Sequence, residues 1–435
     1  MNTIDRRGAI VLLAFGLGAF GLSLPASGQE TITLTYSDWQ LSQDVWGKSL
    51  NEVIDGFEKQ HPNIKVKREP VPLGQRDVKY TTAMRAGGGP DVFALDANPV
   101  RQYIAQGWVK DLSGYVAKSG GETFLADFYP VSLIPVTVDA KTYGIPMNTV
   151  AMTLVYNKKL FEEAGIAGAP KTWDEFRETA KKLTRSSTGG KNIDRWGFAF
   201  VMAPAGFDLR FSAMLRGFGA DFLTKDGQHS ALDTPEAKAA FNFILDLILD
   251  DKSVPPGVTQ VDANGARRLL ANQTAAIKIG TTWSLPEVSA MNPNLDGMHV
   301  LGLAPIPQPA GSTNPIRTTL FQKSIFVNQN AKHPDEAWLL AKHLTDAAAM
   351  RTWYDYNNML SSRKSVNEGY DKISNSSTAK IVSDEIPHGA FLPQTPKWPQ
   401  ILETFRQNLQ AAVSGTKTRD QALTDAHNQI EQLLK

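Results

Sequence analysis

The chain has 435 residues, of which 42% are hydrophobic and 20% are charged, and its formal net charge is +1. This length predicts two lobes or domains rather than one small core, and the balanced charge excludes a strong attraction to nucleic acid or to an anionic membrane surface. The chain contains no cysteine, which excludes disulfides, thiol chemistry and lipid attachment at an N-terminal cysteine.

Residues 1–28 have the pattern of an export segment. Arg6-Arg7 supply a positive start, residues 10–24 are apolar, and Ala26-Ser27-Gly28 offers small residues for cleavage. We expect cleavage near Gly28. A membrane anchor is the alternative, but a spanning helix needs about 20 apolar residues. The paired arginines leave twin-arginine export open beside the general route, although their flanking residues fit the twin-arginine pattern poorly.

Strands and helices alternate through the next part of the chain. Residues 31–36 and 64–71 predict strands, and apolar residues at helical spacing from Trp46 to Phe57 predict a helix between them. Short links make this a parallel, right-handed strand–helix–strand unit. The pattern then repeats, with a helix around Val78 to Met84, a buried strand at 91–96 and a helix at 99–106.

The stretch from Lys141 to Phe176 organises the rest of the chain. Val150 to Tyr156 is a continuous apolar run, which predicts a strand buried on both faces. A short helix follows and ends at Gly165. Thr172 and Glu175 then have the spacing of a capping box, which predicts the start of the next helix.

Several short motifs occur in a fixed order along these two parts of the chain. They are Gly87-Gly-Gly-Pro-Asp-Val-Phe93, Gly107-Trp-Val-Lys-Asp-Leu112, Gly144-Ile-Pro146, Tyr156-Asn-Lys158, Glu163-Ala-Gly165 and Pro170-Lys-Thr-Trp-Asp-Glu-Phe176. Their order and spacing resemble the family 1 extracellular solute-binding proteins, the sugar-capturing receptors of bacterial ABC importers. The resemblance implies an α/β, two-lobed periplasmic-binding-protein fold. Each lobe would be a mostly parallel sheet flanked by helices, and several hinge crossings would join the lobes.

Beyond the crossing, the pattern predicts strands at 196–201, 274–279, 300–305 and 324–327, and helices at 207–218, 234–250, 262–271 and 334–344. Residues from 347 onward are predicted to be mostly helical. The resemblance implies that residues 29–142 and 300–346 form lobe 1, and that residues 143–299 and 347–435 form lobe 2.

Four loops are expected to reach the ligand, because ligands of open α/β sheets bind beyond the carboxyl ends of the strands. These loops are Asp38-Trp39-Gln40, Asp96-Ala97-Asn98, Met147-Asn148-Thr149 and Trp283-Ser284. Aromatic rings cover the apolar C–H faces of a sugar, and carboxylates or amides bind its hydroxyls. This composition favours a neutral saccharide or polyol.

The candidate ligand-binding residues are Trp39, Gln40, Asp44, Asp96, Asn148, Trp283, Ser284 and Arg363. Most of them have a structural alternative. Asp96 fits a helix cap before Pro99, Asn148 fits a backbone partner at the crossing, Trp283 fits ordinary core burial, and Arg363 fits a solvated loop cation.

The resemblance implies a periplasmic receptor, without lipid anchor or cofactor, that closes on a mono- or oligosaccharide or a polyol and delivers it to a membrane permease. We expect a monomer without catalytic activity and without a nucleic-acid partner. We also expect no metal site, because the seven histidines do not have the spacing of metal ligands. A glycerol phosphodiester, polyamine or peptide cargo stays open; a phosphate would require clustered cations, of which only Arg363 is available. The alternative from another class is an exported glycan-degrading enzyme that uses two carboxylates.

Overall fold

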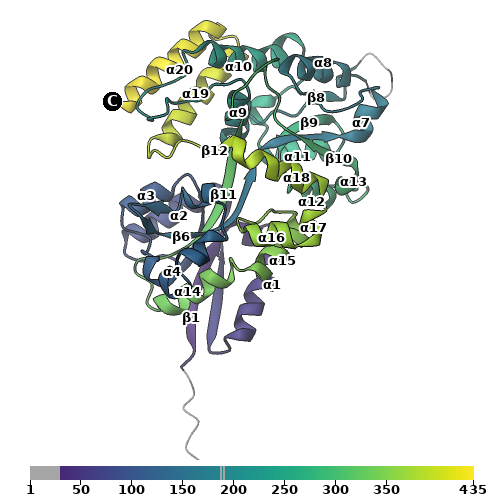
Figure 1. Cartoon of the computed structure of the whole chain (residues 1–435). Helices are drawn as coiled ribbons and strands as arrows, with labels where there is room; N and C mark the ends of the chain where they lie inside the picture. The colour runs from purple at the N-terminus through teal and green to yellow at the C-terminus, as the bar shows by residue number, and fades with distance from the viewer. Residues whose placement is uncertain (1–29, 187–188, 190–191) are drawn as a thin grey trace, which may run out of the picture.

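The computed structural model describes residues 30–186, 189 and 192–435, so the expected export segment at residues 1–28 lies outside the described residues. Two β-sheets, each surrounded by helices, form two lobes that stack end to end (Figure 1). The predicted two-lobed α/β fold is therefore confirmed. None of the helices that the structure describes combines the length and the apolar character that a bilayer crossing demands.

The sheet of lobe 1 has the strand order β12-β11-β3-β1-β2, and β6 also pairs with β11. Its strands are β1 (Ile32–Asp38), β2 (Ile64–Pro70), β3 (Val92–Asp96), β6 (Gly144–Ala151), β11 (Thr318–Val327) and β12 (Gly389–Ala390). β1 pairs in parallel with both β2 and β3, as their alternation with α1 (Asp44–Gln60) and α2 (Leu73–Arg85) predicts. The predicted face of α1 from Trp46 to Phe57 is buried.

Helices and short elements cover this sheet. They are α3 (Val100–Ala105), α4 (Ser113–Lys118), α5 (Glu122–Ala126), α6 (Pro130–Leu133), β4 (Thr137–Val138), β5 (Lys141–Thr142), α14 (Pro334–His343), α15 (Ala347–Asn357), α16 (Lys364–Gly369), α17 (Asp371–Ser374) and α18 (Ser377–Glu385), with 3-10 turns η1 (Trp39–Ser42) and η4 (Ile386–His388).

The helix α15 lies on lobe 1, although the sequence places residues from 347 onward in lobe 2. Its Trp353 ring is 6.3 Å from that of Trp46 on α1, and Asn357 Nδ2 donates to Ser49 Oγ at 2.8 Å. We propose that the boundary of lobe 1 falls after β12 rather than at residue 347.

The sheet of lobe 2 has the strand order β10-β7-β9-β8. Its strands are β7 (Thr153–Asn157), β8 (Trp196–Phe198), β9 (Ala275–Gly280) and β10 (Leu301–Ala304). Only β8 and β9 pair in parallel, so the expectation of a mostly parallel sheet is wrong for lobe 2. β7 enters the sheet from the first crossing and β10 leaves it toward the second crossing, and both strands run against their neighbours. β10 pairs with β7, whereas the sequence places residues 300–305 in lobe 1.

The helical elements of lobe 2 surround this sheet. They are α7 (Lys158–Glu163), α8 (Trp173–Leu183), α9 (Pro204–Gly217), α10 (Pro235–Leu245), the π turn η2 (Asp246–Asp250), the 3-10 turn η3 (Val258–Gln260), α11 (Ala263–Ala271), α12 (Ser284–Met291), α13 (Gly297–Val300), α19 (Trp398–Val413) and α20 (Arg419–Leu434). The predicted capping box between Thr172 and Glu175 opens α8.

Within the described residues the chain crosses between the lobes three times. The first crossing is at Met152, so the strand predicted at 150–156 is in fact two strands in different sheets. The second crossing lies between β10 and β11, and the third between β12 and α19. Several backbone links of this kind allow two lobes to open and close as rigid bodies.

Arg216 of α9 joins lobe 2 to these crossings. The residue is 3% exposed. Its NH1 donates to the Ala390 carbonyl at 2.5 Å and to Thr319 Oγ1 at 3.0 Å, and its NH2 donates to the Phe391 carbonyl at 2.8 Å. One guanidinium therefore holds the second and third crossings together.

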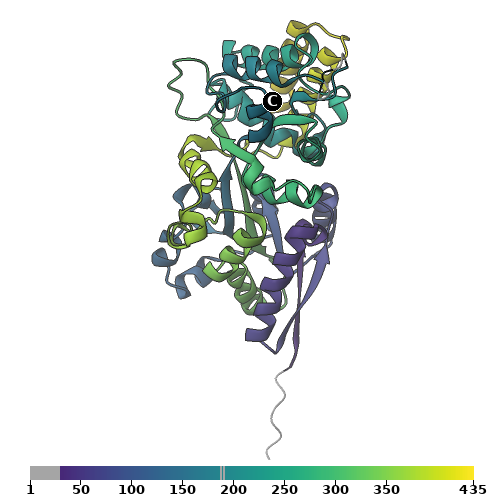
Figure 2. The same cartoon turned by 90° about the vertical axis from the view of Figure 1, so that its right-hand side faces the viewer.

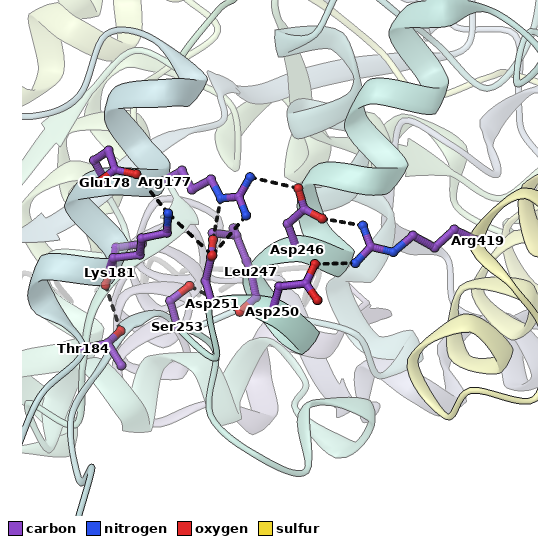
Figure 3. Close-up of polar contacts among 11 residues, drawn as sticks. Arg177, Glu178, Lys181, Thr184, Asp246, Leu247, Asp250, Asp251, Ser253 and Arg419 are labelled. Atoms are coloured by element: carbon purple, nitrogen blue, oxygen red, sulfur yellow. Dashed lines mark hydrogen bonds and ion pairs between the residues drawn. The ribbon is translucent and has the colours of Figure 1, made fainter. Parts of the chain in front are cut away.

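A network of ion pairs stabilises the outer side of lobe 2 (Figure 3). Arg177 of α8 donates to Asp251 at 2.6 Å and to Asp246 at 3.0 Å. Arg419 of α20 binds the same Asp246 and also Asp250, the latter at 2.7 Å. The hydrogen bond to Asp251 is the main cause that raises the pKa of Arg177. Asp246 thus links α8 and α20 to the end of α10.

Candidate functional site

A cavity of about 430 Å³ lies between the two lobes. Lobe 1 contributes Arg76 of α2 and the loop that begins at Asp96, where β3 ends. Lobe 2 contributes Asp208 at the start of α9 and Trp398 at the start of α19. The cavity thus lies at the carboxyl end of a strand, where the sequence analysis expects a ligand.

Asp96 is the predicted ligand-binding residue that lines this cavity. Arg76 NH1 donates to its Oδ2 at 2.9 Å, while Arg76 Nε donates to Asp77 at 2.8 Å. The other oxygen, Oδ1, has no hydrogen-bond partner among the described residues. Burial raises the pKa of Asp96, and Arg76 opposes that rise. The free Oδ1 is therefore an acceptor that a ligand hydroxyl would satisfy.

Asp208 approaches the same cavity from lobe 2. Its Oδ1 accepts a hydrogen bond from the Leu209 backbone N–H at 2.7 Å. Burial raises the pKa of Asp208, and repulsion from Asp96 raises it further. Two carboxylates from different lobes therefore border one cavity.

Trp39 and Gln40 do not line the cavity but support it. Both are 4% exposed. Trp39 carries the Arg76 guanidinium over its ring, 4.7 Å from the centroid, and Lys323 Nζ at 4.8 Å. Lys323 Nζ also donates to Gln40 and to the buried Asp38 carboxylate. The Trp39 ring therefore supports the Arg76 guanidinium, which in turn binds Asp96.

Asn148 and Asp44 also lie outside the cavity. Asn148 is 1% exposed, and its Oδ1 accepts the Lys323 backbone N–H at 3.0 Å, while its Nδ2 has no partner among the described residues. Asp44 is exposed in the first turn of α1. The structural alternative for Asn148, a backbone partner at the crossing, matches the observed contact.

Trp283 and Ser284 lie behind one wall of the cavity. The Trp283 ring meets Phe321 edge-on at 5.2 Å, and Phe321 lines the cavity. Ser284 Oγ accepts a hydrogen bond from Lys278 Nζ at 2.9 Å. The structure therefore places this loop at the boundary between the lobes, separated from the cavity by one ring.

Arg363 lies in lobe 1, away from the cavity. Its Nε donates to the Thr345 carbonyl at 2.7 Å, and its NH1 donates to Asp127 at 3.0 Å. The guanidinium also lies 4.3 Å from the centroid of the Phe128 ring. Arg363 is 8% exposed, so it is not a solvated loop cation, and it does not reach the cavity. Its contacts to Thr345 and Asp127 join two segments of lobe 1.

Several residues of the cavity carry no sequence signal that predicts their place in it. Arg76 lies on a weakly patterned helix that gives no local signal of a role, and Asp208 stands among many carboxylates. Phe391 in the third crossing and Trp398 at the start of α19 contribute aromatic surface. Of these, Trp398 is followed by a local signal for structure alone, since Pro399 lies in the first turn of α19, where proline is favoured.

The two lobes touch each other beyond the cavity. Trp46 Nε1 of α1 donates to Glu287 of α12 at 3.3 Å, and Figure 2 shows α12 beside α1 at the boundary between the lobes. Asn358 Nδ2 donates to the Thr282 carbonyl at 3.3 Å. No group of metal-binding side chains gathers anywhere in the described part of the chain.

Comparisons with known proteins agree with this architecture. Residues 42–351 match the family described as bacterial extracellular solute-binding protein. A binding protein of Brucella abortus (strain 2308) is 28% identical over 423 residues, covering 97% of this chain and 98% of that protein. An ABC transporter solute-binding protein of Thermotoga lettingae, bound with alpha-D-tagatose, is 26% identical with a TM-score of 0.82, covering 93% of this chain and 100% of that one. A maltose-bound protein of T. maritima is 25% identical with a TM-score of 0.80, again covering 93% and 100%.

Proposed function

This chain belongs to the bacterial extracellular solute-binding proteins, and from that premise we propose that it captures a carbohydrate between its lobes and delivers it to the permease of an ABC importer. The two similar solved structures hold alpha-D-tagatose and maltose. Both ligands are sugars, which supports this class of cargo.

The cavity between the lobes is the observation that carries the proposal. Asp96 offers a carboxylate oxygen without a partner among the described residues, and Trp398 and Phe391 offer aromatic surface. A sugar presents hydroxyl groups around its ring and apolar C–H groups on its faces. Carboxylates accept hydrogen bonds from the first, and aromatic rings pack on the second.

Capture would use closure of the lobes about the three crossings. Met152 lies at the first crossing, and Arg216 of α9 bonds to the other two. In the open state the cavity would admit the sugar, and in the closed state both lobes would contact it. The closed form would then dock on the membrane permease.

The proposal extends to where the protein acts. Residues 1–28 would direct export, cleavage near Gly28 would release the mature chain into the periplasm, and the absence of cysteine from the sequence leaves no site for an N-terminal lipid. The mature chain would act as a monomer, because one chain supplies both walls of the cavity.

A thermal-shift screen of the mature chain against sugars and polyols tests the proposal. At least one compound is expected to raise the melting temperature, since a ligand that binds only the folded state stabilises it. Indifference to every member of a broad panel would contradict the proposal. A parallel incubation with chromogenic glycosides and oligosaccharides is expected to give no product, and sustained product release would instead favour a glycan-degrading enzyme.

A further inference from the structure

The boundary between the lobes holds buried polar atoms that have no hydrogen-bond partner among the described residues. Three of them follow one another in the loop after β9: Thr281 Oγ1, Thr282 Oγ1 and Trp283 Nε1. The two threonines are 0% exposed and the tryptophan is 6% exposed. Buried polar groups in folded proteins are nearly always satisfied, so such a run points to a missing partner.

Two buried cations lie near this loop. Lys278 is 0% exposed, and its Nζ donates only to Ser284 Oγ, at 2.9 Å. Arg210 is 4% exposed, its NH1 donates to the Gly206 carbonyl at 2.8 Å, and its Nε has no partner among the residues that the structure describes. Neither cation forms an ion pair with a carboxylate of the described residues. Buried charges are normally paired, because an isolated one is expensive to remove from water.

The nearby carboxylates have other direct partners than these two cations. Burial lowers the pKa of Arg210 to about 10, and repulsion from Arg267 contributes to that fall. Burial also lowers the pKa of Lys278, with repulsion from Arg210 as the next cause. Of the nearby carboxylates, Glu287 pairs with Arg267 at 2.6 Å, and Asp208 binds a backbone N–H.

Another nearby carboxylate is also occupied. Asp262 caps α11 by accepting the Gly265 N–H at 2.6 Å. The surroundings therefore leave buried donors unsatisfied, and both cations stay without a direct ion pair among the described residues.

The loop that carries these donors faces lobe 1. The Thr282 carbonyl accepts a hydrogen bond from Asn358 of lobe 1. The Trp283 ring meets Phe321 of β11, which also lines the cavity. Opening of the lobes would separate these contacts and expose the loop to an entering ligand.

We propose that the ligand carries an anionic group, a carboxylate or a phosphate, which Lys278 and Arg210 bind with the free donors of the loop 281–283. This inference rests on the proposed carbohydrate-receptor function and makes the cargo a uronic acid or a sugar phosphate. Oxyanions accept several charge-assisted hydrogen bonds at once, which a neutral hydroxyl does not. The composition of the four candidate loops favours a neutral saccharide. The proposal differs because Lys278 of β9 and Arg210 of α9, which lie outside those loops, supply cations.

Calorimetric titration of the mature chain with matched ligands tests the inference. Each set in the panel contains a neutral mono- or disaccharide, its uronic acid and its phosphate ester. In at least one set an acidic member is expected to bind about tenfold or more tightly than the neutral one. The member that binds identifies the carboxylate or the phosphate as the source. Equal or tighter binding of every neutral member overturns the inference and leaves the carbohydrate receptor standing. Silence across the whole panel contradicts both.

Substitutions then locate the preference. Lys278→Met and Arg210→Met are expected to bring the ratio of acidic to neutral affinity toward one, whereas Lys65→Met removes a charge from an exposed position on β2 and is expected to leave the ratio unchanged. Lys278→Gln serves as the second variant, because it keeps a polar group beside Ser284 if the methionine variant does not fold. A ratio that persists in the folded variants places the anion elsewhere and overturns the inference.

Discussion

Replacement of Asp96 by asparagine measures how much the charge of this carboxylate contributes to the affinity for the ligand. Oδ2 of Asp96 is engaged by Arg76 at 2.9 Å, and Oδ1 has no partner among the described residues. The side chain is 25% exposed and borders the cavity. A ligand hydroxyl that donates to this carboxylate gains a charge-assisted hydrogen bond, worth about 1.5–3 kcal/mol.

Asp96→Asn is therefore expected to lower the affinity for the sugar that the thermal-shift screen identifies by roughly 10- to 150-fold. Isothermal titration calorimetry measures the change, and urea unfolding verifies that the variant is folded. The matched control is Asp55→Asn, which removes the partner of Arg68 outside the cavity and is expected to bind like the wild type. An affinity of Asp96→Asn within about twofold of the wild type would refute the reasoning.

Three further predictions concern stability. Arg216→Ala leaves the Ala390 and Phe391 carbonyls without their donor, and is expected to lower the free energy of unfolding in urea by about 1–3 kcal/mol for each acceptor that stays buried and unsatisfied. A loss below about 1 kcal/mol would show that the crossings do not depend on this guanidinium. In Gly197→Ala, the new Cβ would lie 2.6 Å from the Ala180 carbonyl carbon, so the melting temperature is expected to fall by an amount equivalent to about 1–3 kcal/mol or more, and an unchanged melting temperature would contradict the packing. Because burial raises the pKa of Asp208, the folded chain takes up a proton at higher pH than the unfolded chain does. As the pH falls from 7, the wild type is therefore expected to gain stability relative to Asp208→Asn, with the gain complete below the unfolded pKa of about 3.9. Urea unfolding at several pH values measures this difference, and a constant difference would show that Asp208 does not titrate with a raised pKa.

Local signals predict the local structure well. The spacing of apolar residues from Trp46 to Phe57 gives the buried face of α1, and Thr172 with Glu175 gives the start of α8. These features depend on residues three or four positions apart. The pairing of β7 with β9 and β10 depends instead on segments more than a hundred residues away, and no local pattern encodes its antiparallel direction.

The candidate site shows the same division. Asp96 follows a recognisable strand, so its place beside the cavity could be predicted. Lys278 sits in the strand sequence Ala-Ala-Ile-Lys-Ile-Gly, where alternation alone suggests a solvent-facing lysine. It is fully buried instead, and its Nζ donates a hydrogen bond to Ser284 of the segment after β9. Likewise, Trp39 has the local character of a ligand contact but lies beneath Arg76.

A crystal structure of the mature chain with the sugar selected by the screen tests the central claim most directly. The account predicts a sugar enclosed between the lobes, with a hydroxyl within hydrogen-bond distance of Asp96 and residues of both lobes in contact with the ring. A sugar bound on the outer surface of one lobe, or one enclosed between the lobes without any contact to Asp96, Asp208 or Trp398, would contradict it.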